Sequence, residues 1–222
     1  CIKEYDLVMD EEITIIDTNT RNEKIRNFFI NNKNKLIIIL LTITILIVGF
    51  LSFAEIKKIN KIKLADHFNS VTLNFQIDKK ENTTKDLINL VKEEDTTYSP
   101  LALYFLIDNK LIKNENDIND LFDVLINKTD LEKEIKNLII YKKAIYNADL
   151  VDENVLIQIV NPLINSESIW KSHALYLIAE YFYSKGENKK AKEFYNQILI
   201  LSNSNKDIVF ASRKRLNRDL SE

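Results

Sequence analysis

The sequence has very few of the residues that shape tight loops and catalytic sites: two glycines, two prolines, two histidines and one cysteine among 222 residues. Phosphate-binding loops need several glycines close together, because backbone amides must approach the ligand, so Rossmann-type and P-loop folds are excluded. All-β sandwiches and barrels, which use glycine and proline at their turns, are disfavoured for the same reason. With 45% apolar and 29% charged residues, the chain is neither disordered nor a polytopic membrane protein. These absences predict an all-α protein.

The residues that carry chemistry are also scarce. His67 and His173 are isolated, and no Cys/His cluster has the spacing of a zinc site. The acidic runs 93–95 and 152–153 fall at expected helix corners, where turns and helix caps are their ordinary roles. Lys and Arg number 31 against 33 Asp and Glu, which gives no sign of nucleic-acid binding. We therefore expect no enzyme, and no cofactor, metal, nucleic acid or small-molecule substrate.

One long apolar run stands apart from the rest of the chain. Residues 36–54 read LIIILLTITILIVGFLSFA and contain no charge. At about 1.5 Å per residue, such a helix spans about 28 Å, close to the roughly 30 Å hydrocarbon core of a bilayer. A buried core helix would keep a polar stripe, and a signal peptide cleaved after Ala54 would not continue the helical periodicity through Ile56 and Leu64. The run predicts an uncleaved transmembrane helix.

The flanks of this run define the expected domain organisation. An N-terminal tail, 1–35, is acidic as far as Thr20 and then basic, and a helical domain occupies 55–222. The first residue is not methionine, and Met9 is a candidate initiator. The positive-inside rule barely decides the orientation, because five basic residues precede the run and four follow it: Arg21, Lys24, Arg26, Lys33 and Lys35, then Lys57, Lys58, Lys61 and Lys63.

The domain after the apolar run contains a repeated pattern. The dipeptide Glu-Asn begins at positions 81, 115, 153 and 187, at spacings of 34, 38 and 34 residues, and apolar residues at helical intervals follow it. Each dipeptide is expected at the start of a second helix, where acceptors and carboxylates suit the free amides. The pattern predicts four helical hairpins and a final helix, 207–220, with the first helices at 64–77, 99–112, 131–148 and 168–185.

The last full copy, residues 172–205, resembles a tetratricopeptide repeat. Two alanines allow the paired helices to touch closely, a glycine supplies a left-handed turn, and larger apolar residues fill the space beside them. The residues of this signature are Ala179, Phe182, Gly186, Ala191, Tyr195 and Leu199. The resemblance implies an α-solenoid of about four hairpins with a capping helix.

Tetratricopeptide arrays bind proteins in a groove lined by their first helices, and the resemblance nominates two sets of residues here. Offsets of three, seven and ten place each set on one helical face. They are His173, Tyr176, Glu180 and Tyr183, and in a related copy Leu101, Tyr104, Asp108 and Leu111. The alternative is that the two central tyrosines pack against a neighbouring hairpin. A basic run on the final helix is expected to be a solvated capping face: Arg213, Lys214, Arg215 and Arg218.

An acidic start at 10–12, a basic amphipathic segment at 21–29, one anchor and degenerate hairpins together resemble the bacterial YfgM-type family. That resemblance implies an inner-membrane protein with a cytoplasmic N-terminus and a periplasmic repeat domain. Its implied partners are the lipid bilayer, the SecYEG translocon and periplasmic chaperones. A scaffold for cell-envelope assembly or division is the alternative, using the same groove for other partners.

Overall fold

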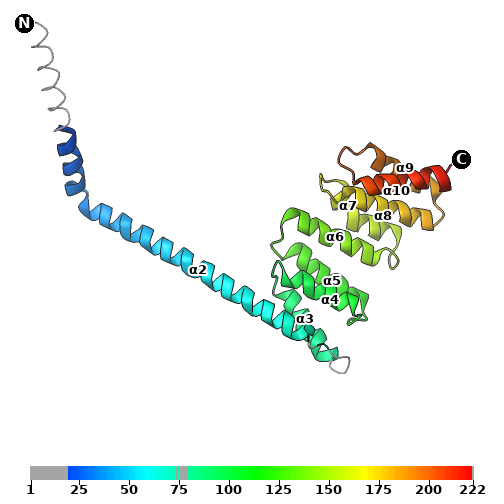
Figure 1. Ribbon diagram of the computed structural model, residues 1–222, viewed down its shortest axis with the longest axis horizontal. Helices are drawn as coiled ribbons and strands as arrows, with labels where there is room; N and C mark the ends of the chain where they lie inside the picture. Colours follow the sequence, from blue (N-terminus) through cyan, green and yellow to red (C-terminus); the bar gives the residue numbers. More distant parts are fainter. Residues whose placement is uncertain (1–19, 74, 76–79, 222) are drawn as a thin grey trace, which may run out of the picture. The chain divides into compact units, whose positions relative to one another are not determined.

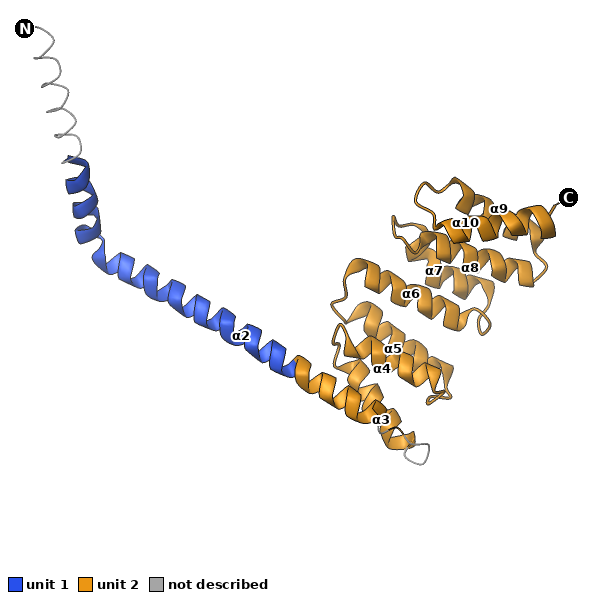
Figure 2. Ribbon diagram, in the orientation of Figure 1, with its two compact units in different colours: residues 1–60 blue, residues 61–222 orange. Residues whose placement is uncertain are grey.

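The computed structural model describes residues 20–73, 75 and 80–221, and every regular element in these ranges is a helix. The all-α prediction is therefore confirmed for this part of the chain. Two compact units are distinguished, residues 1–60 and 61–222 (Figure 2). The expectations for the acidic start, including Met9, and for the end of the 64–77 helix lie outside the described residues.

The first unit is built around an exposed apolar helix. Residues 20–31 are helical, a turn follows at Asn32, and α2 (Lys33–Leu73) runs without a break for 41 residues (Figure 1). Its apolar stretch is long enough to cross a membrane and is wholly unburied. The hydroxyls of Thr42 and Thr44 donate to backbone carbonyls one turn back, so the polar groups within this stretch are satisfied by the helix itself. The predicted continuation of the helix past Ala54 is confirmed.

The second unit is a series of shorter helices that pack in chain order (Figure 1). Each helix from α3 onward contacts the next, and α3 also contacts α5, α6 contacts α8 and α8 contacts α10. The expected first helix at 64–77 is the end of α2, not a separate element. The others are α3 (Lys80–Lys92), α4 (Tyr98–Asp108), α5 (Glu115–Asn127), α6 (Lys133–Asn147), α7 (Glu153–Ile164), α8 (Lys171–Ser184), α9 (Asn188–Ile200), α10 (Lys206–Lys214) and the π-helical turn η2 (Arg215–Asp219).

Two hydrophobic clusters form the core of this unit, and α6 contributes to both. Ile139 belongs to the cluster of α3, α4 and α5, while Ile140 belongs to the cluster that extends through α9 to Leu220. A polar seam joins α5 to α6, where the side-chain amides of Asn119 and Asn147 donate to each other at 3.0 and 2.8 Å. Because both amides are largely satisfied inside the protein, the seam fixes the position of α6 without leaving unpaired polar groups.

The Glu-Asn dipeptides lie at helix starts, as predicted. They occupy the first turn of α3, the first two positions of α5 and α7, and the junction into α9. The capping acceptor comes from the residue before the dipeptide: Asn114 accepts from the amide of Asn116, and Asp152 from that of Val155. Asp152 and Asp95, which accepts from two amides at the start of α4, confirm the interpretation of the acidic runs as turns and caps.

Two helices end in the same hydrogen-bonded turn, the Schellman motif. At the end of α8, Gly186 has φ 76°, its amide donates to Tyr183, and the next amide donates to Phe182. The predicted left-handed conformation of Gly186 is confirmed. At the end of α4, Lys110 has φ 50°, and the amide of Leu111 donates to Leu106 at 2.9 Å.

This second turn corrects one sequence expectation. The helix predicted at 99–112 ends at Asp108, and Leu111 lies beyond it with 7% of its surface exposed. The motif directs the apolar residue after its left-handed position back against the helix. Leu111 is therefore a core residue and not part of a binding face.

Gly186→Ala is expected to lower the free energy of unfolding of the helical domain by about 1–2 kcal/mol. No atom lies within 4 Å of an added Cβ, so the cost arises from the left-handed backbone alone. Urea unfolding of the full chain in detergent, followed by the fluorescence of Trp170, measures the change. Lys185→Ala, one residue earlier at φ −86°, is the control and should change it by less than about 0.5 kcal/mol. Equal effects of the two substitutions would contradict the argument from backbone strain.

Candidate functional site

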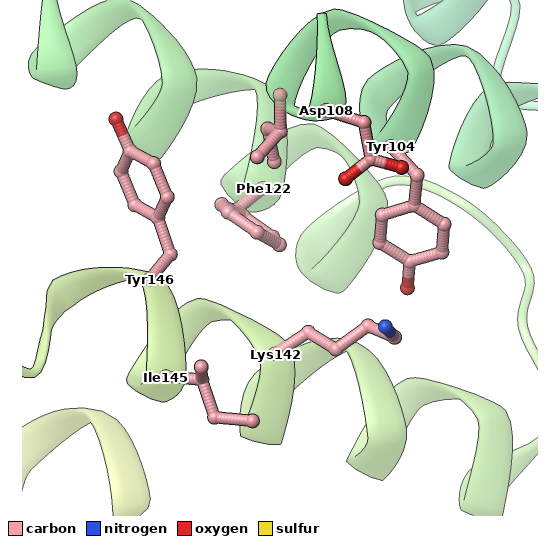
Figure 3. Close-up of a pocket in the computed structure, with 7 residues that line it drawn as sticks. Tyr104, Asp108, Phe122, Lys142, Ile145 and Tyr146 are labelled. Atoms are coloured by element: carbon pink, nitrogen blue, oxygen red, sulfur yellow. The ribbon is translucent and has the colours of Figure 1, made fainter. Parts of the chain in front are cut away.

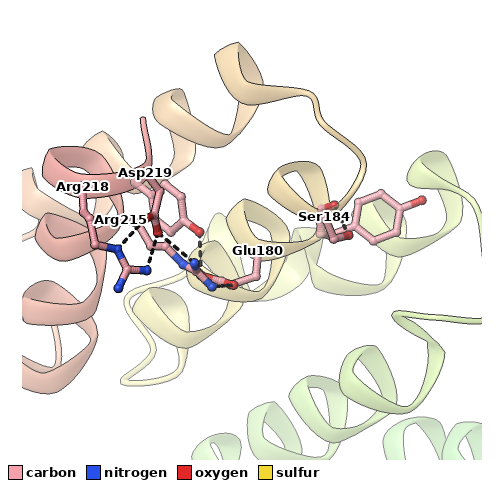
Figure 4. A network of polar contacts seen from close by, with 7 residues as sticks. Glu180, Ser184, Arg215, Arg218 and Asp219 are labelled. Atoms are coloured by element: carbon pink, nitrogen blue, oxygen red, sulfur yellow. Dashed lines mark hydrogen bonds and ion pairs between the residues drawn. The ribbon is translucent and has the colours of Figure 1, made fainter. Parts of the chain in front are cut away.

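The first predicted binding face, on α8, is occupied by the end of the chain. Arg215 donates to both oxygens of Glu180, from Nε at 2.8 Å and from Nη2 at 2.7 Å (Figure 4). Its guanidinium also lies 4.6 Å from the ring centroid of Tyr183. The hydroxyl of Tyr195 donates to the same carboxylate at 2.6 Å. Two of the four residues proposed for this face are therefore engaged by η2.

The same contacts correct the expectation of a solvated basic run. Arg215 is half-buried and also donates to Asp219 at 2.9 Å, and Arg218 donates to both oxygens of the same carboxylate. Arg213, Lys214 and Arg218 are exposed, as expected. The predicted single helix at 207–220 exists as α10 continued by η2, and the wider turn of η2 lies where Arg215 reaches α8.

The network fixes the ionisation of its members. Burial alone would raise the pKa of Glu180, but the hydrogen bonds from Arg215 and the tyrosines outweigh it, so the pKa lies below its ordinary value of 4.5. Hydrogen bonds from Arg218 and Arg215 lower the pKa of Asp219. Burial, and next the Glu180 carboxylate, raise the pKa of Tyr195. The network is therefore built around two carboxylates that are charged at neutral pH.

Acidification is expected to release the C-terminal helix from α8. A carboxyl whose pKa is lowered by folding stabilises the folded state above its unfolded pKa, and that stabilisation is lost as the pH falls through the folded value. The loss therefore occurs below about pH 4.5, the ordinary value of Glu180. Hydrogen exchange of residues 206–219, corrected for intrinsic rates, should accelerate in this range.

Matched variants separate the network from general acid unfolding. Arg215→Gln should expose the helix at pH 7 and flatten the pH dependence, because the carboxylates lose their main partner. Lys214→Gln removes an equal charge from an exposed position and should retain the wild-type profile. If hydrogen exchange in the two variants had the same pH dependence, the Arg215–Glu180 pair would not be what holds the C-terminal helix on α8.

The other residues of the α8 face lie in aromatic surroundings. His173 packs against Trp170 and Tyr141, whose rings stack with centroids 5.7 Å apart. Its Nδ1 is buried without a hydrogen-bond partner. A cavity of about 350 Å³ opens beside Trp170 and His173, bounded by Ile169 and residues 203–205. Tyr176 packs edge-on against Tyr195 within its own hairpin, whereas the alternative for this residue expected packing on a neighbouring hairpin.

The second predicted face, on α4, is open and forms one wall of a pocket. The pocket has a volume of about 260 Å³ (Figure 3). For comparison, an apolar cavity of about 150 Å³ holds a benzene ring. Its lining comes from three helices: Tyr104, Ile107 and Asp108 from α4, Phe122 from α5, and Lys142, Ile145 and Tyr146 from α6. The alternative in which Tyr104 simply packs on the neighbouring hairpin is incomplete, because its ring also faces this space.

The side chains of Tyr104, Lys142 and Asp108 in the pocket have no hydrogen-bond or ion-pair partner among the described residues. The hydroxyl of Tyr104 is buried without a hydrogen-bond partner, and burial raises the pKa of this side chain. The Lys142 ammonium lies 4.6 Å from the Tyr104 ring centroid (Figure 3). Within the described ranges, neither the Lys142 nor the Asp108 side chain takes part in an ion pair or hydrogen bond. A buried hydroxyl without a protein partner costs stability, and a water molecule or a ligand in the pocket can complete it.

The pocket therefore offers apolar walls, the hydroxyls of Tyr104 and Tyr146, the ammonium of Lys142 and the carboxylate of Asp108. Phe122, Ile107 and Ile145 would bury an apolar side chain, and Tyr104 with Lys142 would meet an oxygen acceptor of the same ligand. A peptide supplies both, because each apolar side chain is flanked by backbone carbonyls. Of the predicted α4 residues, Leu101 is exposed outside the pocket and Leu111 is in the core, which leaves Tyr104 and Asp108 in the site.

Sequence reasoning missed the residues from α5 and α6, although a usable signal existed. The second and third Glu-Asn dipeptides are 38 residues apart, at 115 and 153. The same step carries Tyr104 onto Lys142 and Asp108 onto Tyr146, the residues that α6 contributes to the pocket. The repeat spacing thus relates the α4 wall of the pocket to the α6 wall. The residue types differ between the two copies, so the match was not visible from residue identity.

Over the residues that the structure describes, the geometry defines an all-helical protein with one helix long and apolar enough to cross a membrane and with an open pocket on its second unit. Compared with models of protein families, with curated proteins and with solved structures, the chain gave no match. The resemblance to the YfgM-type family stays a prediction based on architecture.

Proposed function

We propose that this chain is a single-pass membrane protein whose helical domain binds segments of other proteins in the pocket between α4, α5 and α6. The observation that carries the proposal is the Tyr104 hydroxyl, which is buried without a partner beside an unpaired Lys142. An apolar side chain of a bound peptide would pack against the apolar walls, and its backbone carbonyl would accept a hydrogen bond from the Tyr104 hydroxyl. The function is binding, and it requires no chemistry from the pocket.

The membrane anchor in this proposal is α2. Apolar side chains are exposed along its whole apolar stretch, including Leu40 at 66% and Phe50 at 73%. In water, exposed apolar surface of this extent is unfavourable, whereas a bilayer supplies an apolar surrounding for it. The helix is about twice as long as the hydrocarbon core of a bilayer, so it continues beyond the membrane.

The helical domain is proposed to be a tetratricopeptide-like α-solenoid. Its support is the packing of helices in chain order, together with the signature residues of the last copy. Ala179 and Ala191 are fully buried in α8 and α9, Phe182 and Tyr195 fill the core beside them, and Gly186 forms the turn. Leu199 is half-buried, and Gly186 is exposed at the turn.

The resemblance noted from the sequence suggests the partners and the location. In this proposal the N-terminus is cytoplasmic, the helical domain is periplasmic, and its partners are the SecYEG translocon and periplasmic chaperones at the bacterial inner membrane. The anchor would keep the pocket close to membrane-embedded partners, which raises the effective concentration of the pocket. A cell-envelope assembly or division scaffold would use the same pocket for different proteins.

Photo-crosslinking in intact membranes tests the binding function. A photoreactive residue at Asp108, in the pocket, should capture a defined protein, whereas one at Leu101, exposed on the same helix outside the pocket, should not. Capture of translocon subunits or periplasmic chaperones supports the first assignment, and capture of envelope-assembly proteins supports the second. Equal capture at the two positions would overturn the pocket as the binding site.

Protease treatment of spheroplasts tests the orientation. Digestion of the helical domain in spheroplasts but not in intact cells is the expected result. Protection of the domain in spheroplasts would place it in the cytoplasm and remove periplasmic chaperones as partners.

A further inference from the structure

A short amphipathic helix precedes α2 and has no packing partner in the described part of the chain. Residues 20–31 are helical, and Ile25, Phe28 and Phe29 recur at intervals of three and four, which places them on one face. They are 49%, 57% and 56% exposed. Exposed apolar side chains are unfavourable in water, so this apolar face indicates a surface that covers it.

Basic residues border this apolar face. At about 100° per residue, Lys24 and Arg26 lie on either side of the stripe, while Glu23, Asn27 and one apolar residue, Ile30, lie opposite it. Glu23 is the only acidic residue between positions 20 and 54. Long basic side chains at the edges of an apolar stripe can extend to lipid phosphates while the stripe enters the interface.

The position of the helix in the chain favours lipid over protein as its partner. A turn at Asn32 ends it, and α2 starts at Lys33, a few residues before its apolar run. The side-chain amide of Asn32 donates to Phe28 at 3.0 Å and closes the last turn. Because only Asn32 separates it from α2, the helix starts at the level of the headgroups when the apolar run spans a bilayer.

We infer that residues 20–31 form an interfacial helix that binds the surface of a bilayer rich in anionic lipid, with Ile25, Phe28 and Phe29 in the acyl boundary and the basic residues on headgroup phosphates. The inference rests on the membrane anchor proposed for α2. It adds a second membrane contact whose strength depends on lipid charge, because each Lys or Arg near an anionic surface changes binding about fivefold.

Site-directed spin labelling of the full chain tests the inference. Single cysteines at position 28 and at position 27 are introduced by Phe28→Cys or Asn27→Cys in a Cys1→Ser background, since Cys1 is the only cysteine. The protein is reconstituted in phosphatidylcholine vesicles with or without phosphatidylglycerol. In anionic vesicles the label at 28 should be accessible to oxygen and protected from a water-soluble nickel chelate, and the label at 27 should be accessible to the chelate.

Charge variants and a deep label complete the test. Lys24→Gln with Arg26→Gln should shift the ratio of bound to released helix by about 25-fold toward release, and molar salt should act in the same direction. Equal chelate access at positions 27 and 28 in anionic vesicles, with a label at Val48→Cys still protected, would overturn the interfacial helix alone. Chelate access at position 48 would contradict the anchor itself and the inference with it.

Discussion

Replacing Phe182 by alanine is expected to lower the free energy of unfolding of the helical domain by about 3–5 kcal/mol. Phe182 is 1% exposed, and its ring stacks on Phe194 with the centroids 5.6 Å apart and the planes inclined by 8°. The Lys190 ammonium lies 4.7 Å from the Phe182 ring centroid, and Lys190 also pairs with Glu153 of α7. Truncation would therefore open a cavity between α8 and α9 and remove the contact of the Phe182 ring with Lys190, the residue that pairs with α7.

The effect is measured by urea unfolding of the full chain in detergent, with the fluorescence of Trp170 as the signal. Trp170 is the only tryptophan and is half-buried between helices of the same hydrophobic cluster. Phe210→Ala is the control, because Phe210 is 71% exposed and its truncation should cost less than about 0.5 kcal/mol. If both variants lost the same stability, the packing of Phe182 would not be what holds α8 to α9.

Regular features of this fold could be predicted because they depend on local rules. The uncharged run at 36–54 predicts an apolar helix by length and composition, and α2 contains it. The Glu-Asn spacing locates four helix starts, because capping acceptors and carboxylates are favoured there. Gly186 predicts a left-handed turn because glycine adopts positive φ at little cost.

Other features depend on contacts between distant parts of the chain. Lys110 takes the same left-handed turn as Gly186 without being glycine, so the end of α4 and the burial of Leu111 had no local signal. Arg215 looks like one member of a solvated basic run, and only the docking of η2 on α8 shows its pairing with Glu180. A charge pattern alone cannot distinguish a solvated arginine from one that meets a carboxylate 35 residues away.

The candidate site could be predicted only in part, because it depends both on local helical offsets and on contacts between distant parts of the chain. Helical offsets placed Tyr104 and Asp108 on a common face, and both line the pocket. The matching face on α8 has the same offsets but is engaged by Arg215. A repeat register therefore indicates which residues can face a groove, and the element that packs next decides whether the groove is open.

Ile145→Trp is expected to reduce capture of the partner from Asp108 by at least tenfold. Ile145 lines the pocket and is 48% exposed, so an indole at this position can fill the space of about 260 Å³ without entering the core. An occupied pocket excludes the apolar anchor of a ligand, and the loss of one such anchor costs about 2 kcal/mol or more. Photo-crosslinking from position 108 in intact membranes gives the yield for each variant.

Ile135→Trp provides the matched control on the same helix. Ile135 is 42% exposed on α6 and does not line the pocket, so its replacement adds the same indole to a similar surface. Its crosslinking yield should equal that of the unsubstituted chain, and both variants should unfold at the same urea concentration. If Ile145→Trp left the yield unchanged while the domain stayed folded, the ligand would have to bind elsewhere. The cavity beside Trp170 and His173, with its unpaired Nδ1, would then be the next position for the photoreactive residue.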